Sequence, residues 1–439
     1  MFNCKKLTPM ATAQMLQIPF EEFTTTAPTK SAQSEISKNP CISAKNVVPL
    51  QPINCSTIFM PHSVNNISTV ILPKNSSMIA SILNSSQQSH QALPHTLPRT
   101  IRVVDLFAGV GGIRLGFAQA AQELGISTDC VFSCEIDDWA CKTYRKNFPN
   151  DTHDPKCDIT AVDAKAIPDF DVLLAGFPCQ AFSIAGKRGG FEDTRGTLFF
   201  DVARIIKEKQ PKVFLLENVK GLTNHRSGKT LQVILNTLRE DLGYTVFYKV
   251  LNAKEYGVAQ LRERIYIVGF KTGGKGFEYP LPLPQEERKV IRDIIEEKPV
   301  DARYYLSTSY LAALKAHKAR HQALGHGFGY EVRDLDEVAG TIVCGGMGKE
   351  RNLIVDTRQT DFTVRTHIKG EYNKEGLRKM TPLEWERLQG FPDNWTAGIA
   401  DVHRYKQMGN SVAVPVIKAV SKHIIVEMLN SMYINEEYS

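Results

Sequence analysis

Residues 101–124, IRVVDLFAGVGGIRLGFAQAAQEL, decide the fold of this chain. The segment begins as an apolar run, passes through the glycine-rich turn DLFAGVGG at residues 105–112, and continues with the apolar spacing of a helix. A strand that leads through glycines into a helix lets the backbone approach a bound nucleotide closely. Tight packing of the helix on the strand is the alternative explanation for these glycines.

The same alternation of strand and helix patterns continues to residue 270. Strand patterns are found at residues 129–135, 171–177, 212–218, 245–252 and 264–270, and amphipathic helix patterns at 137–148, 197–209 and 230–242. This order predicts an α/β domain over residues 99–270, with a doubly wound, mostly parallel, Rossmann-like sheet. The glycine spacing differs from GxGxxG, which favours S-adenosylmethionine over a dinucleotide as the ligand of the turn.

The regions on either side of residues 99–270 differ from them in composition and in the pattern of apolar residues. Residues 1–98 contain no glycine and many Ser, Thr, Asn and Gln residues, which predicts a disordered extension. A small helical module is the alternative there, suggested by residues 10–23. We expect residues 271–405 to form a second, smaller domain of loops and short strands, and residues 406–439 to form a helix that returns to the first domain.

The length, net charge and cysteine content of the chain limit the classes of protein to which it can belong. The chain has 439 residues and a net charge of +6, which weakly favours a polyanionic partner. Nine irregularly spaced cysteines, with no secretory segment after Lys5 and Lys6, predict reduced thiols in the cytoplasm. No apolar run approaches the length of a membrane span. The cysteines at 130, 134, 141 and 157 lack paired CxxC spacing, so no metal site is predicted.

A candidate nucleophile stands in GFPCQAFS, residues 176–183. Pro178 fixes its backbone φ and lacks an amide hydrogen, so the preceding strand must turn and leave Cys179 at its carboxyl end. Ligands of open α/β sheets bind at that edge. An ionised thiol is a strong, soft nucleophile suited to an electron-poor carbon, so Cys179 is predicted to act chemically.

Acidic and basic residues follow other predicted strands. Glu135 ends the second strand, at the distance from the glycine turn where an acid takes ribose hydroxyls, and Asp158 falls where a third strand should end. A capping or turn role is equally open for Asp158. Glu217 ends a later strand and should face Cys179. Arg262 and Arg264 alternate in QLRERIY, so both should point to one face and bind a carboxylate, phosphate or base carbonyl; a salt-bridged strand surface is the alternative.

Six blocks now stand in one order: DLFAGVGG, GFPCQAFS, ENV, QLRERIY, MTPLEWERLQGFPDNW and GNSVAVPV. Together they resemble the DNA (cytosine-5) methyltransferases, especially those of bacterial restriction-modification systems. The resemblance runs from about residue 102 to residue 427, is weak over 271–375 and omits the first hundred residues. It implies a methyltransferase that uses S-adenosylmethionine to methylate C5 of a cytosine in a specific short sequence of double-stranded DNA.

The resemblance also implies roles for residues. Cys179 would add to C6 of a flipped cytosine, Glu217 would protonate N3, and Arg264 would bind the carbonyl O2. Arg262, in the same block, is counted among the catalytic residues. The implied cofactor site consists of Phe107, Ala108, Gly109, Gly111, Gly112, Glu135, Ile136, Asp158, Ile159, Pro178, Asn410 and Ser411. The implied substrate contacts are Gln180, Ser183, Lys187, Arg188, Arg195 and Thr341. Ile136 stands where some relatives have an aromatic residue.

The implied partners are double-stranded DNA and a companion restriction endonuclease, with the chain acting as a monomer and without a membrane. Residues 271–375 would read the DNA bases. Two other functions compete with this one. An RNA cytosine-5 methyltransferase would use the same catalytic set, and a DNA-binding regulator could have lost catalysis. The length of the 271–375 region favours duplex DNA, and the intact PCQ and ENV blocks favour an enzyme.

Overall fold

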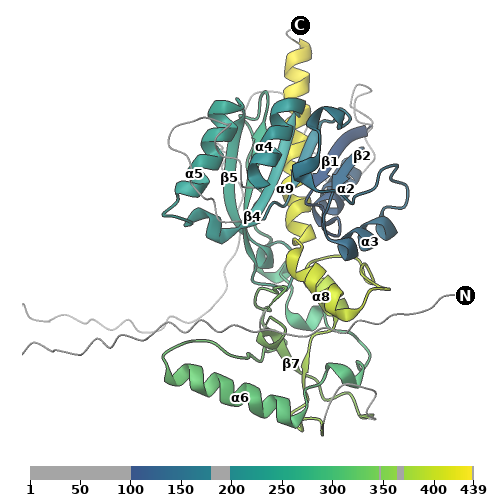
Figure 1. Ribbon diagram of the computed structural model, residues 1–439, viewed down its shortest axis with the longest axis vertical. Helices are drawn as coiled ribbons and strands as arrows, with labels where there is room; N and C mark the ends of the chain where they lie inside the picture. Colours follow the sequence, from purple (N-terminus) through teal and green to yellow (C-terminus); the bar gives the residue numbers. More distant parts are fainter. Residues whose placement is uncertain (1–99, 179–197, 346–347, 363–369, 438–439) are drawn as a thin grey trace, which may run out of the picture. The chain divides into compact units, whose positions relative to one another are not determined.

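The central sheet has the predicted mostly parallel arrangement. The computed structural model describes residues 100–178, 198–345, 348–362 and 370–437. Within this part, one sheet has the order β2-β1-β3-β4-β6-β5 (Figure 1). Its strands are β1 Thr100–Leu106, β2 Ser127–Cys134, β3 Val172–Ala175, β4 Val213–Val219, β5 Thr245–Asn252 and β6 Glu263–Phe270. Only β6 runs antiparallel to its neighbours among these pairings, so the predicted fold class is confirmed.

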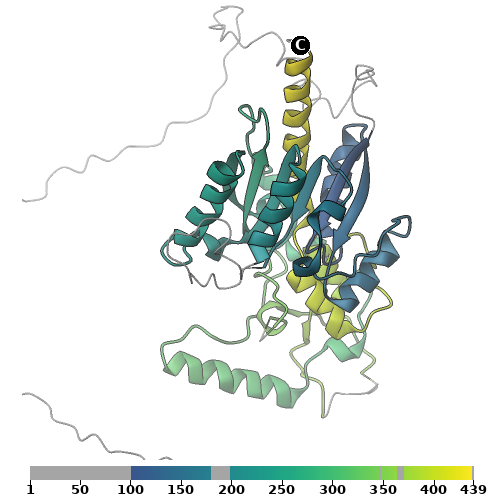
Figure 2. The same cartoon turned by 45° about the horizontal axis from the view of Figure 1, so that its top comes forward.

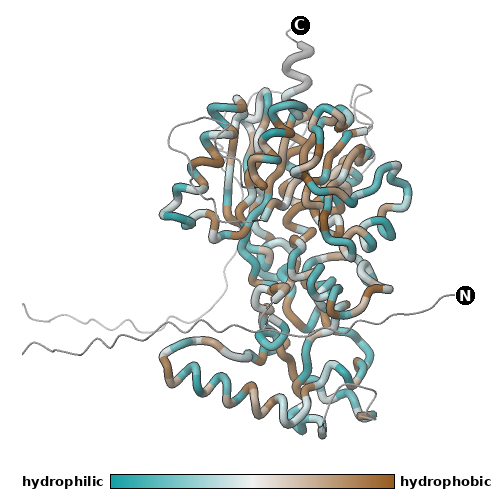
Figure 3. Tube along the Cα trace, in the orientation of Figure 1, coloured by the Kyte–Doolittle hydropathy of each residue, from teal (hydrophilic) through white to brown (hydrophobic). Residues whose placement is uncertain are grey.

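Strand residues alternate between two hydrophobic clusters. Val103 and Leu215 belong to one cluster, whereas their neighbours Val104 and Leu216 belong to the other. Successive side chains of a strand point to opposite faces, so a strand buried on both faces is a continuous apolar run. The centre of the sheet is accordingly brown, or hydrophobic, in Figure 3. This explains why the central strands could be located from the sequence.

Helices cover both faces of the sheet. Helices α2 (Gly112–Glu123) and α9 (Val414–Glu437) pack on one face, and α4 (Leu198–Lys209) and α5 (Lys229–Asn236) pack on the other (Figures 1 and 2). Gly116 permits a close approach of α2 to α9, because a Cβ there would lie 2.7 Å from the Ile417 Cβ atom. The C-terminal helix therefore belongs to the core of the sheet domain.

The end of the chain forms two helices instead of one. Helix α8 spans Asp401–Asn410, and α9 begins at Val414. Pro415 stands at the start of α9, where its missing amide hydrogen costs no helical bond, but it could not sit inside a continuous helix. The break places Asn410, the last residue of α8, and Ser411, which follows it, at the junction of the two helices.

The third strand expected before Asp158 is absent from the described sheet. A single parallel bridge joins Glu135 to Lys156, and Asp158 instead caps the short 3-10 helix Ile159–Ala161. Pro155 interrupts this segment and cannot donate to a strand ladder. The expectation of a strand was therefore wrong, and the capping role left open for Asp158 is observed.

Residues 271–405 contain more helix than the sequence indicated. Helix α6 spans Thr308–Ala323 and α7 spans Pro382–Leu388, while the strands β7 Leu353–Val355 and β8 Leu377–Lys379 are short. Helix α6 buries only Leu311 and Leu314, so it lacks the apolar stripe by which a helix is recognised. Helix α3 (Asp138–Asn147) agrees with its predicted segment.

Buried polar contacts join this region to the sheet domain. The Trp395 indole Nε1 donates to the carbonyl of Val110, in the glycine turn, at 2.9 Å. The Gln260 amide, just before β6, donates to the carbonyl of Leu388 at 2.9 Å. These bonds hold residues of both regions around the same sheet edge.

Two further features concern the class of protein. Among the described helices, none combines the length and the apolar character needed to cross a membrane. Cys134 and Cys157 form a disulfide in the structure, which differs from the expectation of reduced thiols. Their proximity follows from the bridge between residues 135 and 156, which lie next to them in the sequence.

Candidate active site

One cavity gathers the predicted residues at the carboxyl ends of β1 to β4. Its volume is about 530 Å³, within the range of small-molecule sites. The lining includes the predicted residues Phe107, Ala108, Gly109, Gly112, Glu135, Ile136, Asp158, Ile159, Pro178, Glu217, Arg262, Arg264, Asn410 and Ser411. Gly111 and Thr341 are not in the lining. Cys179, Gln180, Ser183, Lys187, Arg188 and Arg195 lie outside the described residues.

The glycine turn is held in an unusual backbone conformation. Phe107 has a φ of 53°, which is rare for a bulky residue, and Gly109 has a φ of 56°. A Cβ at Gly109 would have only the Phe107 carbonyl near it, at 4.0 Å, so the turn is open toward the cavity. At Gly111, a Cβ would lie 2.3 Å from the Phe148 ring. Gly111 therefore serves packing, and Gly109 leaves room for a ligand.

Glu135 anchors this turn. One carboxylate oxygen accepts the Gly109 amide at 2.8 Å, and the other accepts the Asp137 amide at 2.7 Å. Each carboxylate oxygen has a further lone pair, so both can also accept a hydroxyl. Glu135 can thus hold the turn and bind a diol at the same time.

Asp158 and Ile159 form another part of the wall. The Asp158 carboxylate accepts bonds from the Thr160 hydroxyl at 2.8 Å and the Thr160 amide at 3.0 Å, and these bonds lower its pKa. The Ile159 side chain is buried beside it. An ionised, oriented carboxylate next to an apolar surface can accept a bond from a ring amino group while the ring packs on the isoleucine.

Glu217 and Arg264 form an ion pair inside the cavity. The Arg264 Nε atom lies 3.2 Å from a Glu217 carboxylate oxygen. The other Glu217 oxygen lies 3.7 Å from the Cβ position of Gly176, near the end of β3. Burial raises the pKa of the Glu217 carboxyl, and the Arg264 and Arg262 guanidinium groups oppose this shift. A buried carboxyl with a raised pKa is suited to proton donation.

A hydrogen bond joins the ENV block directly to the GFPCQAFS block. The Asn218 side-chain amide donates to the Phe177 carbonyl at 2.9 Å, and both residues are buried. Pro178 follows Phe177 and lines the cavity. This bond therefore fixes the backbone immediately before the predicted nucleophile, a role that the sequence did not reveal.

Arg262 differs from Arg264 in its contacts. Its guanidinium donates to the backbone carbonyls of Ile342, at 3.1 Å, and of Ser411. The Thr341 hydroxyl donates to the carbonyl of Leu261 at 2.5 Å. Burial lowers the pKa of Arg262 to about 9, and the charge of Arg264 adds to this effect. Arg262 and Thr341 therefore join residues 341–342 to the cavity wall, and both Arg262 and Arg264 line the cavity.

An aromatic pair at the cavity was missed by sequence reasoning. The Trp139 and His403 rings are stacked, with centroids 4.2 Å apart and an interplanar angle of 20°. The Gln407 side chain donates to the Trp139 carbonyl at 2.8 Å, which holds α8 against α3. Ile136 is 65% exposed, so it covers little of the site. The one available signal was position, because Trp139 comes four residues after Glu135, at the start of α3.

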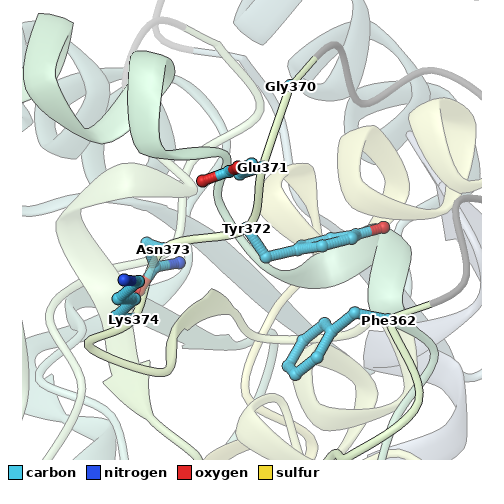
Figure 4. A pocket seen from close by; sticks show the side chains of 6 residues that line it. All are labelled: Phe362, Gly370, Glu371, Tyr372, Asn373 and Lys374. Carbon is cyan, nitrogen blue, oxygen red and sulfur yellow. The ribbon is translucent and has the colours of Figure 1, made fainter.

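A second hollow lies away from this site, between Phe362 and residues 370–374 (Figure 4). The rings of Phe362 and Tyr372 lie 4.8 Å apart between centroids. The Asn373 amide is committed to the backbone carbonyls of Leu306 and Leu377. The described lining lacks the paired acid and base of the first cavity, so the first cavity is the candidate active site.

Comparisons with known proteins agree with this geometry. The family model described as C-5 cytosine-specific DNA methylase matches residues 101–426. The chain is 58% identical over 335 residues to the type II methyltransferase M.HpaII of Haemophilus parainfluenzae, covering 75% of this chain and 90% of that protein. It is 45% identical over 329 residues to M.SsoII of Shigella sonnei, covering 74% and 80%.

A solved structure has the same fold. The S. pombe Dnmt2 methyltransferase superposes with a TM-score of 0.56, covers 76% of this chain and 99% of its own, and is 22% identical. At this identity the likeness concerns the fold alone. The region matched by the family model starts at residue 101, just after the start of β1.

Proposed function

The chain belongs to the C-5 cytosine-specific DNA methylase family, and we propose that its cavity brings S-adenosylmethionine together with a cytosine flipped out of duplex DNA. Family membership makes the chain a DNA cytosine-5 methyltransferase of the type II kind, in preference to the RNA enzyme and the regulator considered from the sequence. The observation that carries the proposal is the Glu217–Arg264 pair, joined through Asn218 to the backbone before Cys179.

The donor set of the cavity fits S-adenosylmethionine. Glu135 would accept the ribose hydroxyls, Asp158 would accept the adenine amino group, and Phe107 would pack on the adenine. Asn410 and Ser411 would contact the methionine end. The open turn at Gly109 supports this fit, because its missing side chain leaves space beside Glu135. When bound, S-adenosylmethionine supplies an electrophilic methyl group to C5 of cytosine.

The chain's own residues activate the base. The Cys179 thiolate forms a bond to C6, and the electron pair of the C5–C6 double bond is delocalised over C5 and N3. Glu217 donates its proton to N3, which removes the negative charge that develops there. Arg264 donates to O2 and stabilises the same charge. After methylation Glu217 takes back the N3 proton and a base removes the C5 proton. The electron pair of that C–H bond reforms the C5–C6 double bond, and the Cys179 thiolate leaves with the electrons of its bond to C6.

The cytosine must leave the base stack to reach this cavity. We propose that residues 183–196, with Lys187, Arg188 and Arg195, contact phosphates and close over the base, and that Gln180 and Ser183 contact the substrate. Residues 271–375 would read the target sequence. The type II relatives support a companion endonuclease as functional partner. We further propose a monomeric enzyme that works in the cytoplasm.

Methylation of duplex DNA at one short sequence is the expected result with purified protein and S-adenosylmethionine. Bisulfite sequencing of a mixed-sequence duplex maps C5-methylated cytosines, and all of them should share one short recognition site. Single-stranded RNA of the same sequence is the control and should stay unmodified. Methyl groups on RNA only, or on exocyclic nitrogen in DNA, would contradict the proposal.

Loss of the Trp139 ring should weaken cofactor binding. The Trp139→Ala change removes the flat wall beside His403, and we expect the dissociation constant for S-adenosylmethionine to rise about tenfold, as for loss of one aromatic contact. Calorimetric titration measures this constant. In the wild-type protein, cofactor should change the tryptophan emission, since Trp385 and Trp395 are buried.

The matched variant Trp139→Phe keeps a ring at this position and should retain most of the affinity. An unchanged dissociation constant in Trp139→Ala, or a wild-type emission that does not respond to cofactor, would exclude Trp139 from the cofactor wall.

A further inference from the structure

A buried arginine joins two segments that belong to different parts of the chain. The Arg262 guanidinium is 3% exposed and donates to the backbone carbonyl of Ile342 at 3.1 Å. It also donates to the carbonyls of Gly409, at 3.4 Å, and of Ser411. Ile342 lies in the region proposed to read the DNA, whereas Ser411 lines the cavity where the cofactor is proposed to bind. One side chain therefore bridges the two regions.

The charge of Arg262 makes this bridge costly to open. Within the part of the chain that the structure describes, Glu217 pairs with Arg264, and Arg262 has no ion pair of its own. Its hydrogen-bond partners there are backbone carbonyls, and its Nε atom is buried without a partner. A buried charge that loses hydrogen bonds raises the free energy of the protein. Residues 342 and 411 are therefore expected to stay together while the guanidinium lies between them.

Two fully buried glutamines extend the same joint. The Gln260 side chain accepts the Ile342 amide at 3.1 Å and donates to the Gln389 side chain at 3.3 Å. The Gln389 amide in turn donates to the carbonyls of Met408, at 2.8 Å, and Ser411, at 3.3 Å. A second path of hydrogen bonds therefore links Ile342 to Ser411.

The two segments also touch each other directly. A Cβ on Gly409 would lie 2.5 Å from the Cys344 amide nitrogen and 2.7 Å from the Val343 carbonyl carbon. Gly409 lies inside α8, where alanine would be the better helix former, so the glycine serves the close approach and not the helix. Contact between the two backbones therefore accompanies the polar joint.

We propose that Arg262 couples DNA recognition to cofactor binding, as a positioning residue that holds residues 341–344 and 409–411 in one arrangement. The inference rests on the proposed function, in which the first segment belongs to the DNA-reading region and the second contacts the cofactor. A ligand that orders either segment orders both, so less conformational entropy is lost when the second ligand binds. Cofactor and duplex DNA should therefore each raise the affinity of the protein for the other.

The test measures the dissociation constant of the duplex that carries the mapped recognition site, without and with saturating S-adenosylhomocysteine. This compound lacks the transferable methyl group, so no reaction occurs. The ratio of the two constants is the coupling factor, and we expect about tenfold in the wild type, within the usual range for coupled sites. The dissociation constant of S-adenosylhomocysteine, without and with duplex, should change by the same factor, because linkage is reciprocal.

Arg262→Lys keeps the charge but replaces a planar group, which can bind several carbonyls at once, with a compact ammonium group. We expect its coupling factor to fall below about twofold. Arg239→Lys is the matched control and should keep the wild-type factor, because Arg239 donates to the Val246 carbonyl, at 2.7 Å, outside the cavity lining. A purely structural role of Arg262 would lower the amount of folded protein and leave the factor unchanged, since the factor is a ratio measured on one sample.

Gly409→Ala tests the joint without changing Arg262, because the added methyl group would collide with the Cys344 amide and separate the two segments. Its coupling factor should fall as well, and circular dichroism verifies that each variant is folded. Low factors in both variants, with the wild-type factor in Arg239→Lys, support the proposal. A wild-type factor near one, or an unchanged factor in either folded variant, overturns it. Wild-type protein that bound neither duplex nor S-adenosylhomocysteine would overturn the proposed function, and this inference with it.

Discussion

We expect Cys179→Ser to abolish methyl transfer, with a fall of about 10⁴-fold or more, and to leave binding of duplex DNA intact. A serine hydroxyl keeps the size of the thiol but ionises far less readily and is a weaker nucleophile toward C6. Binding depends on phosphate and base contacts, which this change does not remove. Transfer of a labelled methyl group measures the first quantity, and a gel-shift titration measures the second.

A duplex with 5-fluorocytosine at the target tests the same residue independently. In 5-fluorocytosine a fluorine replaces the C5 proton that a base must remove after methyl transfer. Fluorine cannot be removed in this way, so the bond between Cys179 and C6 persists. Wild-type protein should form an adduct that survives denaturing electrophoresis, and only when S-adenosylmethionine is present. Cys344→Ser removes an exposed free cysteine and serves as the control that keeps the adduct. An adduct with Cys179→Ser would rule out this nucleophile.

Glu217→Gln should lower the turnover number by about 10²- to 10⁴-fold, the usual contribution of a positioned acid. The amide can still donate a hydrogen bond to N3 but cannot transfer a proton. Substrate affinity should change much less, because the hydrogen bond to the base survives. Steady-state kinetics separate the two quantities.

The pH profile gives a second readout of Glu217. Burial raises the pKa of this carboxyl, so the proton needed for catalysis is retained above the ordinary titration range of glutamate. Activity should therefore fall as the pH rises through this raised pKa, and this alkaline limb should vanish in Glu217→Gln. Glu263→Gln is the control, because Glu263 pairs at the surface with Lys220 at 2.9 Å. If Glu263→Gln matched the loss, or if the limb persisted in Glu217→Gln, the acid would be another group.

The pairing of Glu217 with Arg264 illustrates what local sequence patterns can predict. Glu217 stands near the end of β4, and Arg264 stands at the start of β6, so the sequence located each residue at a strand terminus. They meet at 3.2 Å because β6 runs antiparallel to β4, with Val219 opposite Arg264. The glycine turn and Glu135 follow in the same way, because the first two parallel strands place them side by side.

Other features of the structure could not be predicted from a short stretch of sequence. Arg262 occupies the same motif as Arg264, yet it binds the carbonyls of Ile342 and Ser411, which come from distant parts of the chain. The Trp139–His403 stack joins residues that are far apart in sequence. Helix α6 was not predicted, because a helix that buries only two residues has almost no periodic pattern of apolar residues in its sequence. Each of these features depends on contacts between segments that no local window contains.

The sequence alone determined the α/β sheet, the glycine turn and the set of acids and bases at its edge, because hydrophobic periodicity and the positions of strand ends are local properties. Only the tertiary structure decided which of these groups meet. It gave Arg262 the backbone carbonyls of Ile342 and Ser411 as partners while Arg264 pairs with Glu217, and it made Asp158 the cap of a short helix as well as part of the cavity wall. The physical reason is burial: a polar group removed from water must find a partner, and that partner can come from any part of the chain.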